Sequence, residues 1–560
     1  MNFDESTLRA EFPELILESR RADGSGITFK LHVPAMPPGR SFESAEVWLP
    51  NGFPEWSKAR IRLSSDAILR IPHVENGGLL CIGGDPGPGV GWQALDRLRA
   101  LLFAYREDFL ARWQSGDLDG DFLKEAQNYW GLNVTRSRSK DDPVLSVWTV
   151  ALPEKREDVL EGVLLLPGRI VVVAGIGTNV VRRLVDSLGP RATQQIRVLV
   201  ADISVSYGLV PSTWPNDEAS LNRLLQVRLT QHQQDSFFSP IRRRQPRVHR
   251  IALFRSPQGN FAYLLPGGPP TVVQEGKRAR ARPSRLTSLP LEVERFDPSW
   301  TVGRDQHSEV ASRQRKHVLV LGAGALGSPV IEHLAKAGIG RVTVIDNDSF
   351  ESANVGRHLL GVDAIDHKKS EAVAQRVMCS HPSCSVYPVT VSAETWLRAN
   401  TLEKFDLVID LTGEPDVRWA VDKSRRAQSR PLLIGWMEPF VAAAHACLLP
   451  ANVYWIDDID KPNDKLTELE AVKWPAEVIR QEPGCSSRFQ AYTAAQAAYA
   501  VALVSEHAID LVDGKVQEPQ IYSWLRGQEF LDAHGHGLEF KPWAASAAPH
   551  DGLIIKRRFQ

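Results

Sequence analysis

A glycine-rich turn between a strand pattern and a helix pattern constrains this 560-residue chain more than any other feature. Residues 316–321 read Lys-His-Val-Leu-Val-Leu, a buried-strand run, and Gly-Ala-Gly-Ala-Leu-Gly follows at 322–327. Residues 328–337 have helical periodicity, and a second strand run ends at Asp346. This order predicts a βαβ unit of a parallel sheet, with the turn at the N-terminus of the helix.

The turn itself predicts phosphate binding. Gly322, Gly324 and Gly327 have the spacing that lets backbone N–H groups approach a phosphate at a helix N-terminus. Asp346 is placed to accept hydrogen bonds from ribose hydroxyls. The C-terminal part of the chain is therefore predicted to be a Rossmann-like nucleotide-binding domain, the alternative being such a domain that has lost its ligand.

The segment after the second strand distinguishes ATP from a dinucleotide. Residues 346–357 read Asp-Asn-Asp-Ser-Phe-Glu-Ser-Ala-Asn-Val-Gly-Arg, a D-x-D-x-x-x-x-x-N-x-x-R pattern. This pattern resembles the ATP-binding signature of the ThiF/MoeB and ubiquitin-activating enzyme superfamily. The resemblance implies a homodimer that uses ATP and Mg²⁺. The positions that inherit contacts with ATP are Asp348, Asn354, Arg357, Lys369 and, reaching the phosphates in the other subunit of a dimer, Arg304.

One position departs from that family. Residues 408–414 read Val-Ile-Asp-Leu-Thr-Gly-Glu and align with the family's D-C-T-D-N, so that Gly413 stands where a magnesium-associated Asp is expected. Adenylation of a carboxylate expels pyrophosphate, and cations must offset the charge on the phosphates. Asp410 or Glu414 is expected to substitute as the metal ligand.

A second resemblance lies near the N-terminus. Residues 71–82 read Ile-Pro-His-Val-Glu-Asn-Gly-Gly-Leu-Leu-Cys-Ile, which resembles the active-site stretch of ubiquitin-conjugating enzymes. The resemblance makes Cys81 an acyl carrier. His73 replaces the Asn of that family, and we expect it either to donate a hydrogen bond to an oxyanion or to act as a base toward a lysine amine. A purely structural role for His73 is the alternative.

The other candidate nucleophile is Cys485, which precedes a helix predicted from about residue 489 to 512. A helix N-terminus favours thiolate, the attacking form of cysteine. In activating enzymes that this chain resembles, a cysteine in this loop takes the acyl group as a thioester. Five cysteines without a C-x-x-C pair argue against a disulfide framework or a cysteine zinc site, and the other three are expected to be structural.

The chain as a whole is predicted to be an α/β multidomain protein. We expect an α+β ubiquitin-conjugating-like domain at 1–148, an α/β middle domain at 149–295 and the Rossmann-like ThiF/MoeB adenylation domain at 296–560. The middle domain carries no obvious chemical motif. Its basic clusters at 242–244 and 277–282 are interpreted as solvated surface, because neither has interleaved aromatic residues.

The composition limits where in the cell the protein is expected to be and which kinds of partner it is expected to bind. The net charge of −1 provides no bulk field for nucleic acid or membranes. The N-terminal residues lack the pattern of a signal peptide, and no apolar run is long enough to span a bilayer. We therefore expect a cytoplasmic protein that binds neither a membrane nor nucleic acid.

The two resemblances together imply a relay in one polypeptide. The combination resembles the activating-conjugating fusion proteins of bacterial defence operons, including those of cyclic-oligonucleotide antiphage signalling (CBASS). It implies that a carboxylate is adenylated, captured on Cys485, passed to Cys81 and given to a target lysine. The implied donor is a protein with a flexible C-terminus, a cGAS-like nucleotidyltransferase that is thereby primed.

Three alternatives remain open. The donor could be a ubiquitin-like protein, with the same residues at work. The chain could be a sulfur-carrier adenylyltransferase, which would not need Cys81. It could also be a non-catalytic scaffold that binds a nucleotide.

Overall fold

The computed structural model divides the chain into two compact units, which are described separately. The first unit comprises residues 1–148, 153–173 and 194–294, and the second comprises 149–152, 174–193 and 295–560. The structure describes residues 10–13, 15–16, 25–89, 91–150, 152, 157–175, 179–206, 208–215, 217–242, 249–265, 272–275, 278–281, 288–461, 463–475, 478, 480–481, 488–489, 492–535 and 537–559.

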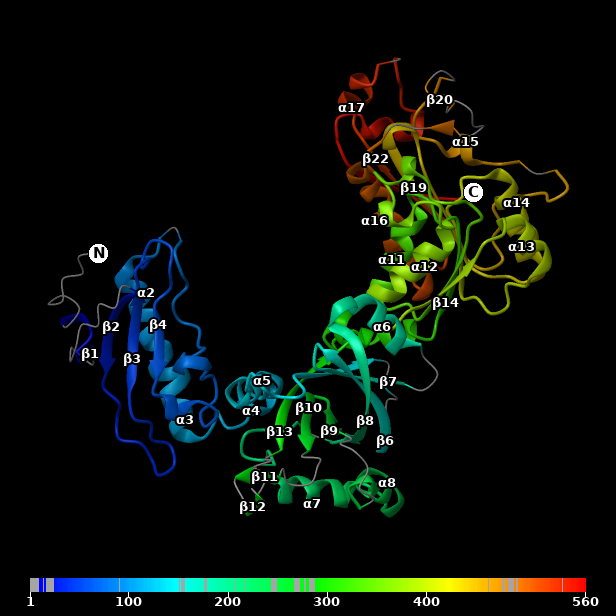
Figure 1. The fold of residues 1–560 in the computed structure, drawn as a ribbon. Coiled ribbons are helices and arrows are strands. Elements are labelled where there is room, and N and C mark those ends of the chain that lie inside the picture. Colours follow the sequence, from blue (N-terminus) through cyan, green and yellow to red (C-terminus); the bar gives the residue numbers. More distant parts are fainter. Residues whose placement is uncertain are drawn as a thin grey trace. The chain divides into compact units, whose positions relative to one another are not determined.

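The first unit opens with a four-stranded antiparallel meander (Figure 1). Its strands, in their order across the sheet, are β1 (Leu15–Ile16), β2 (Gly26–Leu31), β3 (Ala45–Pro50) and β4 (Arg60–Leu63). Alternate residues of β3 are buried, as expected for a strand with one face on a core. Helix α2 (Ala94–Phe103) contributes its leucines to this core and continues as a π-helical stretch, η3 (Ala104–Ala111).

Three further helices follow in the same unit: α3 (Arg112–Ser115), α4 (Asp121–Lys124) and α5 (Ala126–Ser137). Helix α5 packs on the barrel described next. The indole Nε1 of Trp130 donates to the carbonyl of Leu291 at 2.8 Å, and its ring lies edge-on to Tyr263. Trp130 is fully buried, so this contact anchors the end of α5 nearest the barrel.

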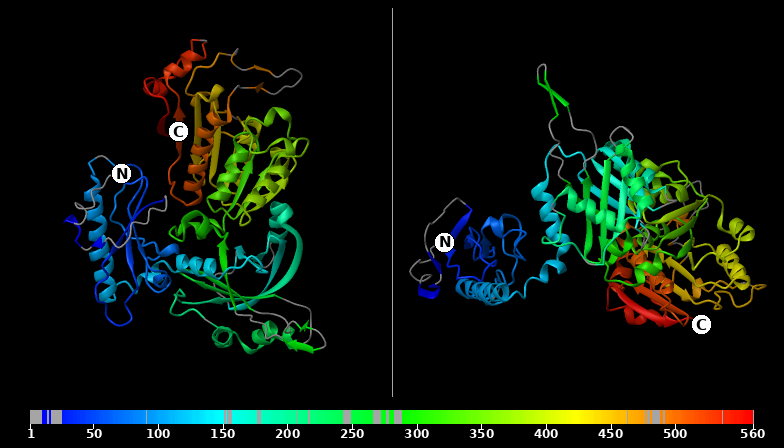
Figure 2. Two further views of the ribbon diagram at one scale, coloured as in Figure 1. Left: turned by 60° about the vertical axis from the view of Figure 1, so that its left-hand side comes forward. Right: turned by 90° about the horizontal axis from the view of Figure 1, so that it is seen from below.

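The middle of the chain forms a closed barrel (Figures 1 and 2). Its strands are β5 (Ser146–Val150), β6 (Asp158–Pro167), β7 (Ile170–Ala174), β8 (Ala192–Ser204), β9 (His249–Ser256), β10 (Gly259–Leu265) and β13 (Leu289–Arg295). Helices α7 (Glu218–Arg228) and α8 (Gln231–Arg242) lie between β8 and β9 in sequence. The predicted mixture of buried strands and helices is present, but closure into a barrel was not evident from the sequence, because it depends on pairing between distant strands.

An eight-stranded sheet forms the centre of the second unit. Across it the strands run β16 (Ser385–Val389), β15 (Arg341–Ile345), β14 (His317–Leu321), β17 (Leu407–Asp410), β18 (Leu432–Met437), β19 (Ala443–Leu449), β22 (Gln520–Leu525) and β23 (Leu553–Arg558). The first five are parallel and the last three are antiparallel.

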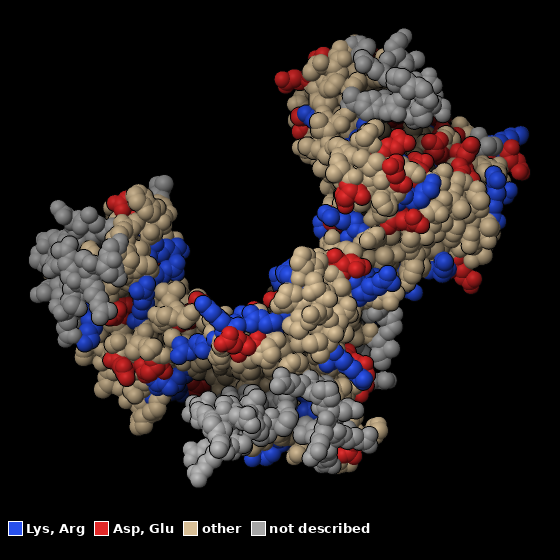
Figure 3. Space-filling model, viewed as in Figure 1, with Lys and Arg blue, Asp and Glu red and all other residues tan. Residues whose placement is uncertain are grey.

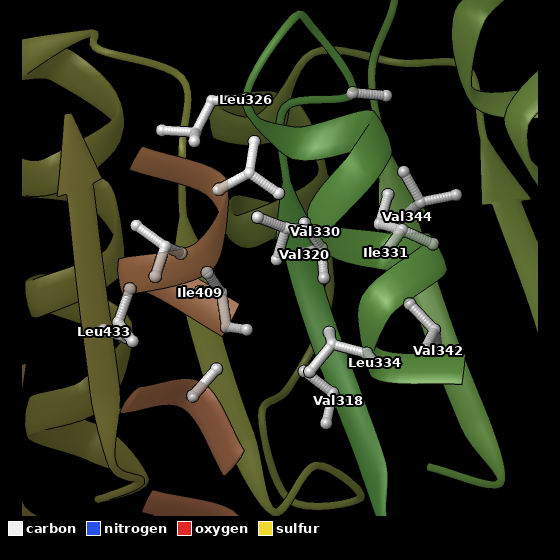
Figure 4. Packing of buried hydrophobic residues seen from close by; sticks show 14 of the residues in the cluster. Val318, Val320, Leu326, Val330, Ile331, Leu334, Val342, Val344, Ile409 and Leu433 are labelled. Atoms are coloured by element: carbon white, nitrogen blue, oxygen red, sulfur yellow. The ribbon is translucent and has the colours of Figure 1, made fainter. Parts of the chain in front are cut away.

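Helices cover both faces of this sheet. Helices α11 (Gly327–Lys336), α12 (Lys369–Ser380) and α16 (Ala494–Val512) contribute to the core on one face, which Figure 4 shows around α11. Helices α13 (Ala393–Ala399) and α14 (Pro415–Ala427) contribute to the core on the other. Parallel strands that are covered on both faces consist of near-continuous apolar runs, as β14 does. The predicted Rossmann-like arrangement is therefore confirmed.

Charged side chains of both signs are interspersed on the face of the molecule seen in Figure 3. In the part of the chain that the structure describes, no helix is both long and apolar enough to cross a bilayer.

Candidate functional site

The glycine turn lies where strand β14 ends and helix α11 begins, at the carboxyl edge of the parallel strands. Gly322 has a φ of +91°, and a Cβ added there would lie 3.1 Å from the backbone of Leu411. A Cβ on Gly327 would lie 2.0 Å from the carbonyl oxygen of Gly322. Gly324, by contrast, has no atom within 4 Å of such a Cβ. The turn is thus tightly packed on the protein side and open at Gly324.

Asp346 closes this turn from the neighbouring strand. Its Oδ2 accepts a hydrogen bond from the backbone N–H of Ala323 at 2.7 Å, and its Oδ1 accepts one from Asp348 at 2.9 Å. Burial raises the pKa of Asp346. A carboxylate oxygen has more than one lone pair, so these contacts leave room for a ribose hydroxyl.

The structure brings two of the predicted ATP contacts together at the start of α12. Lys369 Nζ lies 2.9 Å from Asp348 Oδ2, and the backbone N–H of Lys369 donates to the Asp348 carbonyl. Lys368, in contrast, donates its Nζ to the carbonyl of Asn347. The Lys369 side chain is only 12% exposed, so its charge is held at the edge of the sheet.

The other three residues predicted to contact ATP interact with neighbouring residues of this chain. Asn354 Oδ1 accepts from the backbone N–H of Glu351, which caps a short turn. The Arg357 guanidinium lies 5.2 Å from the ring centre of Tyr492. Arg304 is exposed, has a left-handed backbone with φ of +49°, and lies over the ring of Trp300.

The two predicted metal ligands differ in environment. Asp410 is buried, and its Oδ1 accepts from the N–H and the hydroxyl of Thr412. Its Oδ2 has no hydrogen-bond partner among the described residues. Burial raises the pKa of Asp410. Glu414 is exposed, and its backbone N–H donates to Thr412 Oγ1. Within the described ranges, no three His, Cys, Asp or Glu side chains gather as a metal cluster.

His358 is a residue of this site that the sequence did not single out. Its Nε2 lies 2.6 Å from the carbonyl oxygen of Ala323, and its Nδ1 accepts from the backbone N–H of Leu360 at 3.1 Å. Nε2 must therefore carry the proton and donate it to the glycine turn. Its position one residue after Arg357 was the only available hint.

We expect His358 to make unfolding pH-dependent. Burial lowers its pKa from 6.5 to about 4. The contribution of neutral His358 to the free energy of unfolding is complete above pH 6.5. It is lost as the pH falls from 6.5 through about 4, a total of about 3 kcal/mol. Urea unfolding at pH 7.5 and 5 measures this slope. His358→Gln keeps a donor for Ala323 and should make this slope shallower, while other buried histidines, such as His317, whose pKa burial also lowers to about 4, still contribute to it. The exposed His367→Gln should leave the slope unchanged.

The candidate acyl carrier Cys81 and its neighbour His73 are brought together in the first unit. The backbone N–H of Cys81 donates to the carbonyl of His73 at 2.7 Å. Cys81 is exposed. Partial desolvation raises the pKa of its thiol, and the negative charges of Glu75 and Glu125 raise it further.

The other four cysteines differ in their surroundings. Cys485 lies outside the described residues. Cys384 and Cys447 are buried, which raises the pKa of Cys384 to about 12 and that of Cys447 as well, so both are poor nucleophiles. Cys379 is half-buried. The burial of Cys384 and Cys447 and the partial burial of Cys379 are consistent with the structural role predicted for these three cysteines.

Comparison with known proteins identifies the domain that holds the glycine turn. The sequence profile of the ThiF family matches residues 304–455. This part of the chain is a ThiF domain. The match includes β14, the turn, α11, Lys369 and Asp410, so the predicted resemblance is confirmed for this domain.

Three relatives extend the comparison. The chain is 37% identical over 118 residues to the adenylyltransferase and sulfurtransferase UBA4 of Yarrowia lipolytica, covering 21% of this chain and 30% of UBA4. It is 25% identical over 271 residues to the ATP-dependent ubiquitin transferase-like protein Cap2 of Pseudomonas aeruginosa, covering 47% and 49%. It is 32% identical over 130 residues to the sulfur carrier protein adenylyltransferase of Thermus thermophilus, covering 23% and 47%. The chain thus spans at most about half the length of these relatives.

Proposed function

We propose that this chain is an ATP-dependent ubiquitin transferase-like ligase. Its ThiF domain adenylates the C-terminal carboxylate of a protein, the acyl group passes as a thioester through Cys485 and Cys81, and an amine finally accepts it. Each transfer replaces one leaving group by another that the next nucleophile can displace.

The open glycine turn is the observation that carries the adenylation step. A helix N-terminus favours an anion, and among the described residues no atom lies within 4 Å of a Cβ placed on Gly324. ATP supplies the adenylyl group that turns a carboxylate into a better acyl donor. Lys369 and Arg357 would offset phosphate charge, and Asp346 would hold the ribose.

The unpartnered oxygen of Asp410 supports Mg²⁺ binding at the same edge. A buried carboxylate oxygen without a donor is costly, and a cation is one partner that would remove this cost. Asp410 directly precedes Leu411, whose backbone contacts Gly322. Gly413 supplies no side chain, so we assign the metal to Asp410, with Glu414 as a second ligand.

The N-terminal part supports the conjugating step. We propose that residues 1–148 form a ubiquitin-conjugating-like domain, residues 149–295 a connecting domain and residues 296–560 the adenylating domain. The antiparallel meander, followed by an exposed Cys81 and helix α2, fits the first assignment. The raised pKa of the Cys81 thiol makes it a poor leaving group, which favours a long-lived thioester.

We further propose the substrate class and assembly. The donor is a protein with a flexible C-terminus, for which the sequence resemblance to the activating-conjugating fusions of CBASS operons favours a cGAS-like nucleotidyltransferase over a ubiquitin-like protein. The acceptor is a lysine of a target protein. The enzyme works as a homodimer in which Arg304 reaches the phosphates bound by the other subunit.

A sulfur-carrier adenylyltransferase is the second candidate, which the similarity to the Thermus enzyme favours. It predicts adenylation without any need for Cys81. Acyl transfer to Cys81 would distinguish the two functions.

Gly324→Val tests the adenylation step. The added side chain enters open space, so the domain should fold normally, but it would block a phosphate from the turn. We expect ATP–pyrophosphate exchange, measured with the donor protein, to fall at least about 100-fold. Unchanged exchange would contradict nucleotide binding at this turn. Gly131→Val in helix α5, another glycine whose Cβ meets nothing among the described residues, lies outside the ThiF domain; it is the control and should exchange normally.

A further inference from the structure

His73 is held in an unusual conformation beside Cys81. Its φ of +63° is in the left-handed region, which non-glycine residues rarely adopt and which often marks a functional position. Its N–H donates to the Tyr129 hydroxyl at 2.7 Å, and its carbonyl accepts from Cys81 at 2.7 Å. Helix α5 and the cysteine therefore hold the backbone of His73 from two sides.

Asp121 holds the ring of His73 through one nitrogen. His73 Nε2 lies 3.1 Å from Asp121 Oδ2. A hydrogen bond from Lys124 is the main factor that lowers the pKa of Asp121, to about 2, and Arg112 lies 3.3 Å from the same carboxylate. An ionised carboxylate cannot donate, so the ring must carry a proton on Nε2. In the neutral ring, Nδ1 therefore has the lone pair.

The second ring nitrogen faces another carboxylate. His73 Nδ1 lies 3.6 Å from Glu125 Oε1, which is too long for a hydrogen bond. The Tyr129 hydroxyl donates to the other oxygen of Glu125 at 2.9 Å. Among the described residues, no donor is hydrogen-bonded to Nδ1 or Oε1. Two acceptors thus lie side by side, and the Glu125 side chain is 42% exposed.

The backbone of His73 is hydrogen-bonded directly to that of Cys81, so this pair of acceptors belongs to the surroundings of the thiol. The charge of Glu125 acts directly on Cys81, as does that of Glu75, whereas Arg60 is the opposing cation. Two carboxylates and one guanidinium leave a net negative charge around the thiol, and this charge favours an incoming ammonium group.

We propose that His73 Nδ1 and Glu125 Oε1 together form the subsite for the acceptor amine, with His73 as its base and Asp121 as the positioning residue that sets the ring tautomer. Tyr129 positions Glu125 in the same way. The inference rests on the proposed role of Cys81 as acyl carrier and adds the residues that would bind and deprotonate its acceptor amine.

Transfer of the acyl group to the amine forms one bond and breaks another. The amine nitrogen forms a bond to the thioester carbonyl carbon, and the carbon–sulfur bond breaks with its electron pair leaving on Cys81 Sγ. Before this attack the lysine ammonium gives one proton to Nδ1, and His73 passes that proton to solvent. The second proton leaves the nitrogen as the carbon–sulfur bond breaks and ends on Cys81 Sγ. The products are an amide and the Cys81 thiol. A base that removes the proton from the nitrogen makes the amine nucleophilic and so assists the transfer.

The test uses the full-length chain with Cys485→Ala, in which Cys81 is loaded by exchange with a glycyl peptide thioester. This loading bypasses ATP, so a failure of adenylation cannot imitate a failure here. Single-turnover discharge is then measured with Nα-acetyl-lysine and with hydroxylamine, which is already neutral near pH 7. Asp121→Asn and Glu125→Gln are compared with Asp119→Asn, whose carboxylate pairs with Arg40 at the surface.

We expect Asp121→Asn and Glu125→Gln to slow discharge to lysine at least about tenfold at pH 7 and to leave discharge to hydroxylamine within about twofold. The difference in discharge rate between these variants and the parent should become smaller toward pH 10, where the lysine amine loses its proton without a base from the enzyme. Asp119→Asn should behave like the parent. Equal losses with both nucleophiles would indicate a structural role and overturn the inference, as would no loss with either. Failure to load Cys81 would contradict the proposed carrier function itself.

Discussion

Cys485→Ala should abolish every thiol-sensitive adduct that the enzyme forms with its donor, whereas Cys81→Ala should leave one, on Cys485. In the proposed relay Cys485 takes the acyl group first, so without it nothing reaches Cys81. Without Cys81 the relay stops one step later, and no amide product forms. Wild type and variants are incubated with ATP, Mg²⁺ and the cGAS-like nucleotidyltransferase proposed as donor, and non-reducing gels are compared with reducing gels.

Cys379→Ala is the control for this pair of substitutions, because Cys379 is half-buried and lies near neither candidate motif. It should form both adducts. If neither Cys485→Ala nor Cys81→Ala changes adduct formation, the relay is wrong, and the chain is an adenylating enzyme or a scaffold with two structural cysteines. If Cys81→Ala removes all adducts, the order of transfer is reversed.

Lys369→Met should reduce ATP–pyrophosphate exchange by about 100- to 1,000-fold, the effect of removing one preorganised group that stabilises developing charge. Lys369 lies at the N-terminus of α12, is 12% exposed and is fixed by Asp348, so its charge is preorganised at the carboxyl edge of the sheet. Methionine keeps most of the length of the side chain and removes only the cation.

Lys368→Met is the matched control for Lys369→Met. The two lysines are neighbours, but Lys368 donates to the carbonyl of Asn347, and its loss should change exchange less than about threefold. Similar losses in both variants would show that the segment as a whole matters, and not the cation of Lys369. Thermal unfolding of both variants separates a loss of chemistry from a loss of folded protein.

Much of the ThiF domain could be predicted because its signal is local. The strand, turn, helix and second strand lie within about 30 consecutive residues, the usual extent of a βαβ unit, and the predicted bounds match β14, α11 and β15 closely. The close approach of Gly327 to Gly322 is also local, because one turn supplies both residues. Gly322, in contrast, approaches Leu411, which is distant in the sequence. The predicted division at residues 148 and 295 and the assigned catalytic roles stay predictions.

The sequence by itself thus determined the ThiF type of the C-terminal domain, because that signal depends on residues that are close in the chain. The roles assigned to the two cysteine motifs stay predictions. Only the tertiary structure placed Asp121, Glu125 and Tyr129 against His73, about 50 positions away, and showed that Asp410 has an oxygen without a partner. It also closed the middle strands into a barrel. Such contacts depend on how separately formed elements pack, and no local pattern of residue types encodes which distant side chains will meet.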